Sequence, residues 1–220
     1  MANKTVSFRS QECSNPACRF RFPVMTGREI VNRCPKCGAP LDERQAASYG
    51  RHRVRHTLAS PTFELHVLLD NIRSAYNVGS IFRTAEAAGV KKLHLCGMTA
   101  TPEHPKLAKT AIGAERNILW DYANNAVVAG EALLDAGFSL WAIEGGEEAI
   151  SLFDVELPKP DAKIGLVLGN ELAGVDPALL SRCERILYIP MLGGKESLNV
   201  TVAFGIAAYY LRGVYSTRPV

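Results

Sequence analysis

The feature that most constrains the fold of this chain is a regular alternation of short apolar runs and helical patterns, which begins at Phe63. Each apolar run has the length of a buried strand, and the segments between the runs space their apolar residues as helices do. This alternation is typical of an α/β domain whose helices cover both faces of a largely parallel sheet. Strands are predicted at residues 64–69, 92–96, 139–143, 165–168 and 186–189, and helices at residues 78–88, 123–135, 177–182 and 198–210.

Glycines support the predicted ends of three of these helices. Gly89, Gly137 and Gly213 each stand just after a helical pattern. The residue that follows a helix often adopts a left-handed backbone conformation, which glycine adopts without steric cost. We therefore expect these three glycines to be carboxyl caps.

Three polar loops are candidates for a binding site, because ligands of open α/β sheets bind outside the carboxyl ends of the strands. The first loop, residues 70–79, contains Asn77, which we expect to cap the helix that carries Arg83. The second loop, residues 168–174, directly follows an apolar strand, and the third is residues 191–199. The motifs G-x-G-x-x-G and G-x-x-x-x-G-K-[ST] do not occur, which argues against dinucleotide and P-loop sites.

The third loop is the most informative of the three. Gly193 and Gly194 allow the backbone to approach a ligand without obstruction by a Cβ atom. Ser197 and Asn199 place a hydroxyl and an amide beside the first turn of the next helix, where unpaired backbone N–H groups point outward. This polar patch on an apolar scaffold favours a small-molecule site. The alternative is an ordinary helix N-cap.

Four of the six cysteines lie close together near the amino terminus. The segment reads Cys13-x4-Cys18, then fifteen residues, then Cys34-x2-Cys37. Two thiol pairs at this spacing favour a tetrahedral zinc site with four thiolate ligands, although free thiols or a redox pair are alternatives. A segment of this size buries little core, so a metal would supply the missing stability. We predict a zinc-ribbon-like, RNA-binding module at residues 1–42, a β-ribbon that includes Phe20, Phe22, Val24 and Ile30, and a basic linker at residues 43–60.

Charge is distributed unevenly along the chain. Residues 1–60 hold 11 of the 25 Lys and Arg residues but only 4 of the 22 Asp and Glu residues, which gives them a net charge of +7. The remaining 14 basic and 18 acidic residues give the rest of the chain −4. A basic arm beside a near-neutral core suits contact with phosphates, and chance clustering on a solvated surface is the alternative.

The sequence also bears on the location of the protein. The first dozen residues hold no apolar run typical of a signal peptide. The longest apolar stretch, near residues 198–211, is shorter than the roughly 20 residues that a membrane span needs. We therefore expect a cytoplasmic protein without a membrane partner, in which cysteines are reduced.

Taken together, the three loops resemble the three motifs of the SPOUT, or α/β trefoil-knot, RNA methyltransferases, in the TrmH/SpoU branch that methylates ribose 2′-hydroxyls. The match extends over residues 63–213 and consists of NVGSIFRTA at 77–85, LVLGNE at 166–171 with Gly174, and IPM at 189–191 with SLNV at 197–200. The resemblance implies a parallel-sheet trefoil-knot domain at residues 61–215, with the carboxyl-terminal chain threaded through a loop. It also implies S-adenosylmethionine as the cofactor, a homodimer, and tRNA or rRNA as the substrate.

The resemblance further implies roles for individual residues. Arg83 matches the catalytic arginine, and four polar residues match those that shape the site around it: Asn77, Glu171, Ser197 and Asn199. Cofactor contacts are implied for Leu168, Gly169, Asn170, Gly174, Ile189, Met191 and Leu198. Motif 1 departs from the family pattern, because Ser74-Ala75-Tyr76 stands where a proline or glycine often precedes the asparagine. This departure and the four-cysteine module leave the identity of the RNA open.

The expected chemistry is a displacement of the methyl group from a sulfonium by a ribose oxygen. A guanidinium has a pKa above about 12 and is intrinsically a poor general base. Our hypothesis is that Arg83 binds the adjacent phosphate and stabilises the developing alkoxide, whereas family mechanisms give this arginine a proton-accepting role. Two rival functions are a non-catalytic RNA-binding protein on an inactive knot and base methylation by the same fold.

A few residues outside the motifs carry weaker expectations. Lys106 and Lys109 would share a basic helical face that either contacts RNA or is merely solvated. His66 and His94 lie in apolar strands and are expected to be hydrogen-bonded core histidines. Cys96 and Cys183 are expected to be core residues too.

Overall fold

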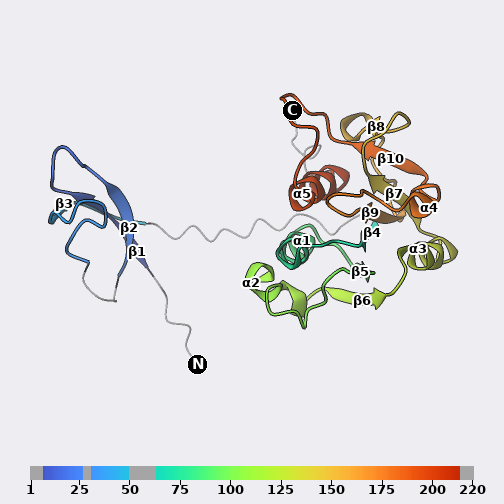
Figure 1. Ribbon diagram of the computed structural model, residues 1–220, viewed down its shortest axis with the longest axis horizontal. Coiled ribbons are helices and arrows are strands. Elements are labelled where there is room, and N and C mark those ends of the chain that lie inside the picture. Colours follow the sequence, from blue (N-terminus) through green and yellow to red (C-terminus); the bar gives the residue numbers. More distant parts are fainter. Residues whose placement is uncertain (1–6, 27–30, 50–62, 214–220) are drawn as a thin grey trace. The chain divides into compact units, whose positions relative to one another are not determined.

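The computed structural model describes residues 7–26, 31–49 and 63–213 (Figure 1). The chain divides into two compact units, residues 1–58 and residues 59–220. The first unit contains the four clustered cysteines, and the second contains the three loop motifs.

The first unit contains a three-stranded antiparallel sheet in the order β2-β1-β3. Its strands are β1 (Phe8–Cys13), β2 (Arg21–Met25) and β3 (Leu41–Ser48). The expected ribbon is therefore present around Phe22 and Val24, whereas Ile30 lies outside the described residues. Strand β3 differs from expectation, because it extends to Ser48, well inside the segment 43–60 predicted to be a linker. The strand was not predicted because its sequence is polar, and backbone pairing with β1 holds it in place. Residues 50–60 of the predicted linker lie outside the described residues.

The second unit is built on a seven-stranded sheet in which all described pairs are parallel. The strand order is β6-β5-β4-β9-β7-β10-β8. This confirms the predicted parallel α/β class. The strands are β4 (Glu64–Asp70), β5 (Lys92–Cys96), β6 (Leu119–Ala123), β7 (Ser139–Ile143), β8 (Ile150–Ser151), β9 (Lys163–Leu168) and β10 (Arg185–Tyr188).

An apolar cluster lies on each face of this sheet. Helices cover both faces (Figure 1). Leu65, Val67 and Leu69 of β4 join the cluster that contains residues of α1 (Ala75–Ala87) and α5 (Val200–Leu211). Leu68 joins the cluster with residues of α3 (Ala126–Asp135) and α4 (Pro177–Leu180). Alternate residues of one strand thus face opposite layers, and both sets are fully buried. This double burial explains why the strands read as continuous apolar runs in the sequence.

The helices begin and end slightly away from their predicted positions. Helix α1 begins at Ala75 because Ser74, and not Asn77, is its N-cap, and α3 begins at Ala126 because Ala123 belongs to β6. Gly89, Gly137 and Gly213 have φ values of 66°, 82° and 65°, as expected for carboxyl caps. The helices are α1 (Ala75–Ala87), α2 (Ala108–Ala111), α3 (Ala126–Asp135), α4 (Pro177–Leu180) and α5 (Val200–Leu211), with short 3-10 helices η1 (Ala114–Arg116) and η2 (Leu152–Asp154).

The two histidines in the sheet are buried and hydrogen-bonded, as predicted. His66 Nδ1 lies 3.1 Å from His94 Nε2. The outer nitrogens of the pair contact carboxylates, with His66 Nε2 3.0 Å from Glu64 Oε1 and His94 Nδ1 2.8 Å from Asp121 Oδ1. This chain of contacts connects β4, β5 and the edge strand β6. Cys96 is fully buried as expected, whereas Cys183 is only partly buried.

No helix among the described residues has the length and apolar character needed to cross a membrane.

Candidate active site

A pocket of about 720 Å³ lies at the carboxyl ends of β7, β9 and β10. Its walls come from the loop after β7, the loop after β9, the end of β10 and the start of α5. All seven residues for which cofactor contacts were expected line it, and so do three of the expected polar residues. These ten are Leu168, Gly169, Asn170, Gly174, Ile189, Met191 and Leu198, together with Glu171, Ser197 and Asn199.

The loop after β9 is closed by its own backbone. The N–H and C=O groups of Asn170 and Gly174 bond each other in both directions, at 2.9 Å each. This closure leaves no space beside Gly169, where a Cβ atom would lie 2.3 Å from the carbonyl carbon of Gly174 and 2.3 Å from the nitrogen of Val175. Gly174 has a φ of 77°, which favours glycine. The two glycines therefore fix the shape of one pocket wall.

Glu171 connects this loop to the loop before α1. Its carboxylate accepts hydrogen bonds from the backbone N–H groups of Arg73 (2.8 Å) and Ser74 (3.1 Å), and from the side-chain amide of Asn77 (2.9 Å). Asn170 adds a fourth link, because its amide donates to the carbonyl of Asn71 at 2.7 Å. The first and second motifs are thus joined through charge-assisted bonds.

Burial by itself would raise the pKa of the Glu171 carboxyl, but the hydrogen bonds from Arg73, Asn77 and Ser74 outweigh it and lower that pKa. The carboxylate therefore stays ionised at neutral pH. An ionised group with its oxygens already occupied by donors is suited to positioning the loops, and it is a poor proton acceptor.

The third motif joins the same network through Asn199. Its side chain caps α5 by accepting from the N–H of Thr201 at 2.9 Å, so the N-cap interpretation of this residue is confirmed. The amide of Asn199 also reaches the side-chain oxygen of Asn77 at 3.4 Å. Asn77 was expected to cap α1, but it lies in the first turn of that helix and bridges Glu171 and Asn199. Ser74 is the cap because its hydroxyl accepts from the N–H of Asn77.

Arg83 is placed differently from the other expected residues. It lies on α1, is exposed, and does not line the pocket of its own chain. It shares one side of the helix with Gly79 and Glu86, at spacings of four and three residues. That side meets the segment after β5, since a Cβ atom on Gly79 would lie 2.3 Å from the carbonyl oxygen of Leu107, and Glu86 accepts from the amide of Asn117 at 2.6 Å.

The segment opposite α1 does not form the expected helical face of two lysines. Helix α2 begins at Ala108, so Lys109 is helical and Lys106 is not. Turns precede α2, and the N–H of Lys106 donates to His104 Nδ1 at 3.2 Å. Both lysines are exposed.

Sequence reasoning missed the pocket wall after β7. Glu144, Gly145 and Gly146 all line the pocket, and Glu144 Oε2 accepts from the N–H of Val175 at 2.9 Å. The signal was available, because these residues directly follow a predicted strand at its carboxyl end.

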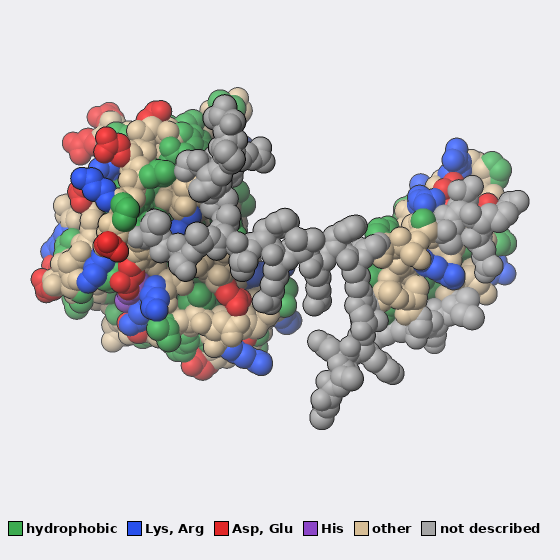
Figure 2. Space-filling view, turned by 180° about the vertical axis from the view of Figure 1, so that it is seen from behind, with side chains coloured by type: hydrophobic (Ala, Val, Ile, Leu, Met, Phe, Trp, Pro, Cys, Tyr) green, Lys and Arg blue, Asp and Glu red, His purple; other side chains and the backbone are tan. Residues whose placement is uncertain are grey.

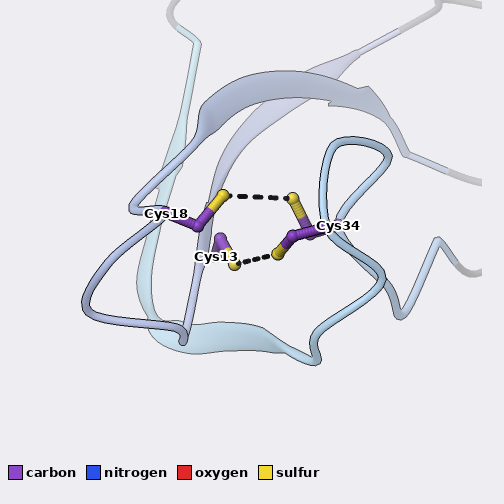
Figure 3. A group of neighbouring side chains, drawn as sticks. Cys13, Cys18 and Cys34 are labelled. Atoms are coloured by element: carbon purple, nitrogen blue, oxygen red, sulfur yellow. Dashed lines mark hydrogen bonds between the residues drawn. The ribbon is translucent and has the colours of Figure 1, made fainter.

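The four clustered cysteines converge in the first unit (Figure 3). All four sulfurs lie within 4.8 Å of one another, with Cys13 Sγ 3.4 Å from Cys37 Sγ and Cys18 Sγ 3.9 Å from Cys34 Sγ. The N–H of Lys36 donates to Cys34 Sγ at 3.4 Å, and a backbone hydrogen bond from Ala39 lowers the pKa of Cys37 to about 7. None of the six cysteines of the chain is in a disulfide.

Comparison with known proteins gives a consistent result. The profile of the SpoU rRNA Methylase family matches residues 64–209. A tRNA (guanosine(18)-2′-O)-methyltransferase of Aquifex aeolicus is 32% identical over 174 residues, which cover 76% of this chain and 80% of the relative. The 23S rRNA (guanosine(2553)-2′-O)-methyltransferase RlmP of Bacillus subtilis is 33% identical over 153 residues, which cover 67% of this chain and only 57% of the relative.

Solved structures show the same relationship. The A. aeolicus TrmH/SpoU tRNA modifying enzyme superposes with a TM-score of 0.61 at 30% identity, covering 70% of this chain and 79% of that structure. The SpoU methyltransferase AviRb from Streptomyces viridochromogenes, in complex with AdoMet, also has a TM-score of 0.61, at 27% identity, and the alignment covers 70% of this chain and 62% of AviRb.

Proposed function

Because the chain belongs to the SpoU rRNA Methylase family, we propose that it transfers a methyl group from S-adenosylmethionine to a ribose 2′-hydroxyl of tRNA or rRNA. The observation that carries this proposal is the junction at Glu171, Asn77 and Asn199, which ties the three motif loops together at one pocket. The pocket suits the cofactor, since it is concave, and it is lined by apolar side chains and by the backbone of a closed glycine loop.

Bound S-adenosylmethionine would supply a methyl group on a positively charged sulfur. In our proposal the chain contributes positioning, which in favourable cases supplies on the order of 7–11 kcal/mol of barrier reduction. Leu168, Ile189 and Leu198 would hold the cofactor by apolar contacts, and the backbone of Gly169 would approach it closely. Asn77 and Ser197 orient the acceptor hydroxyl. The ribose oxygen would take the methyl group as its bond to sulfur breaks, and the hydroxyl proton would pass to solvent water.

We assign to Arg83 the contact with RNA at the reacting sugar. Its guanidinium is exposed and unpaired among the described residues, so it is available to bind a phosphate in bidentate fashion. The positive charge would then stabilise the alkoxide that develops on the ribose oxygen. Because Arg83 does not line the pocket of its own chain, its approach depends on how RNA and a second subunit are placed.

We propose that the protein acts as a homodimer. Several large apolar side chains near the mouth of the pocket are exposed, among them Leu172 (81% exposed), the fully exposed Leu192, and Val202 on α5. Exposed apolar groups of this size are typical of a surface that a partner covers. Sedimentation at micromolar concentration, compared with a Leu172→Lys and Val202→Lys double variant, tests this directly. We expect the natural chain to sediment as a dimer and the variant as a monomer.

We propose that the cysteine cluster holds one structural Zn²⁺ ion. Tetrahedral zinc with bonds of about 2.3 Å separates its sulfur ligands by about 3.8 Å, and two pairs in the cluster lie 3.4 and 3.9 Å apart. Zinc thiolates require reduced cysteines, which supports our placement of the protein in the cytoplasm. The module would bind RNA, since residues 1–60 carry a net charge of +7.

The proposal is tested by incubating the full chain with a labelled methyl donor and unmodified tRNA and rRNA in separate reactions. We expect label in one RNA class, in dinucleotides that resist nuclease digestion, because a 2′-O-methyl group blocks cleavage at that sugar. Label that is recovered in bases would point to base methylation. Cofactor binding without transfer to either RNA class, or no cofactor binding, would contradict the proposed activity.

A further inference from the structure

We propose that one face of the sheet in the first unit is a stacking surface for unpaired RNA nucleotides. We call it the aromatic face and define it by Phe8, Arg21 and Tyr49. The inference rests on the proposed function, because it takes RNA to be the substrate. It goes further by naming the residues that touch the RNA and the part of the RNA that they recognise.

The strand register places these three residues on one side of the sheet. Phe8 pairs with Met25, and Glu12 pairs with Arg21, so residues 8 and 12 of β1 share a face with residues 21 and 25 of β2. Tyr49 directly follows β3, and its N–H donates to the carbonyl of Phe8 at 2.9 Å, opposite Phe8 in the register that pairs Arg9 with Ser48. The two aromatic residues therefore occupy opposite positions on neighbouring strands.

Both rings face solvent. Phe8 is 40% exposed and Tyr49 is 53% exposed, and neither ring packs against another ring of the described residues. The next positions along this face are small, with Pro23 and Ala47 on either side of Ser10. The rings consequently stand beside a floor of small residues, with Met25 on the other side of Phe8, and about half of each aromatic residue is exposed to solvent. Aromatic side chains in this setting bind successive bases by stacking, whatever the sequence of the bases.

Arg21 supplies the charge on the same face. Its guanidinium lies over the floor, donating to Ser10 Oγ at 2.9 Å and to Glu12 Oε2 at 3.1 Å. The same carboxylate also accepts from Arg19 at 3.3 Å, so one anion is shared by two cations. These contacts fix the plane of the Arg21 guanidinium while its side chain stays 45% exposed. A fixed planar guanidinium suits a phosphate oxygen pair or the edge of a base.

The chemistry of the aromatic face favours RNA over a protein partner. Residues 1–60 carry a net charge of +7, which remains +5 after four thiolates and one Zn²⁺ ion are counted. Lys and Arg side chains also appear on the described surface of this unit in Figure 2. Isolated rings beside a guanidinium match bases and phosphates, whereas a stable protein interface needs a broader apolar area. Paired bases offer no free flat sides, so the recognised element is single-stranded.

The test uses the full chain and a fluorescent twelve-nucleotide oligouridine, with an A–U duplex of equal length as the comparison. We expect tighter binding of the single strand. Phe8→Leu and Tyr49→Leu keep apolar bulk but remove the ring, and each should weaken oligouridine binding about tenfold. Phe8→Tyr should bind like the natural chain. Phe20 provides the matched control, because it is similarly exposed (37%) but stacks on Phe22 on the opposite face.

Zinc content and thermal melting of each variant show whether the module remains folded. Equal binding by the leucine variants, an equal loss in Phe20→Leu, or no preference for the single strand would each overturn the inference. Methylation of tRNA or rRNA in parallel separates the two proposals. If the leucine variants methylate RNA normally and with an unchanged KM for RNA, the proposed role of the aromatic face is contradicted and the proposed activity is not. If oligouridine binding depends on the rings but the protein transfers no methyl group, the proposed activity is contradicted and the aromatic face is not.

Discussion

The two units of this protein reach a folded state by different means. In the second unit, strands such as β4 and β9 are buried on both faces by helices, and most of their residues are buried. In the described part of the first unit, the buried apolar residues are Cys13, Val24 and Cys34. Two of these three are proposed metal ligands. The comparison indicates that hydrophobic burial stabilises the second unit, and it fits our proposal that a metal stabilises the first.

Removal of zinc should therefore have the largest effect, confined to the first unit. We expect Cys34→Ser, or a strong chelator, to unfold the module, because structural zinc contributes on the order of 10 kcal/mol to such small folds. Differential scanning calorimetry should show that the transition of the second unit is unchanged. Cys183→Ser serves as the control, since that thiol is outside the cluster. A chain that keeps the β1–β3 sheet without bound metal would break the comparison.

A clash in the glycine loop should have the next largest effect, this time in the second unit. In Gly169→Ala the new methyl group would lie 2.3 Å from backbone atoms that cannot move independently. We expect loss of measurable S-adenosylmethionine binding and destabilisation by about 3 kcal/mol or more. The matched variant is Gly205→Ala, because a Cβ atom there lies 3.8 Å from Thr84 Cγ2, an ordinary contact, and Gly205 does not line the pocket. Calorimetric titration of both variants measures the difference, and equal cofactor affinity would show that the loop does not shape the pocket.

Arg212 provides a test of how the end of α5 is held against the backbone around Phe63 and Gly89. Its guanidinium donates to the carbonyl oxygens of Phe63, Ala88 and Gly89 at 2.6–3.0 Å, and it lies over the ring of Phe63. Burial lowers the pKa of Arg212 to about 10, so it remains charged at neutral pH. Arg212→Met should cost about 2–3 kcal/mol of unfolding free energy, because the carbonyls lose their donors. Arg116→Met, at an exposed position, should cost less than about 1 kcal/mol, and urea titrations that gave the two variants equal losses would contradict this role.

The sequence predicted the interior of the second unit better than its margins. Residues 92–96 and 139–143 were predicted with their observed bounds, because apolar side chains predominate in strands that are buried on both faces. Strand β6 was missed because it is an edge strand whose sequence includes Asp121 and exposed Leu119. The start of α1 was misplaced because Ser74 and Asn77 are both good caps, and only the tertiary bonds of Asn77 decide between them.

The same contrast holds for the site. Pocket residues from motifs 2 and 3 were identified through the family resemblance, and their loops converge because β9 and β10, which both pair with β7, end at the same edge of the parallel sheet. Glu171 joins the loops through hydrogen bonds to residues nearly a hundred positions away in the sequence, and no local sequence pattern predicts such bonds. The placement of Arg83 outside the pocket of its own chain was equally invisible in the sequence, because it depends on how α1 packs.

The smallest expected effect concerns acid sensitivity of the second unit. Burial and the neighbouring His94 lower the pKa of His66. Burial alone would raise the pKa of Asp121, but its bonds to His94 and Lys92 lower that pKa to about 2. A lowered pKa means that the unfolded chain binds more protons, so this stability is present above the unfolded pKa and is lost as the pH falls. The loss should begin near pH 6.5 for His66 and below about pH 4 for Asp121.

Asp121→Asn should lower the unfolding free energy by about 1 kcal/mol at pH 7, a figure that allows for the exposed position of Asp121. The variant should also lose less stability than the natural chain as the pH falls. Unfolding free energies from pH 3 to pH 8 measure this change. An equal dependence of unfolding free energy on pH in the variant and the natural chain would show that other groups cause the loss of stability in acid.

The most direct test of the account as a whole is a paired measurement on Arg83→Ala. We propose that the loops joined at Glu171 bind the cofactor and that the exposed guanidinium of Arg83 contacts only the RNA acceptor. This proposal therefore predicts an S-adenosylmethionine Kd equal to that of the natural chain, together with a single-turnover rate of ribose methylation lower by about a thousandfold. Methyl transfer by the variant at a near-natural rate would contradict it.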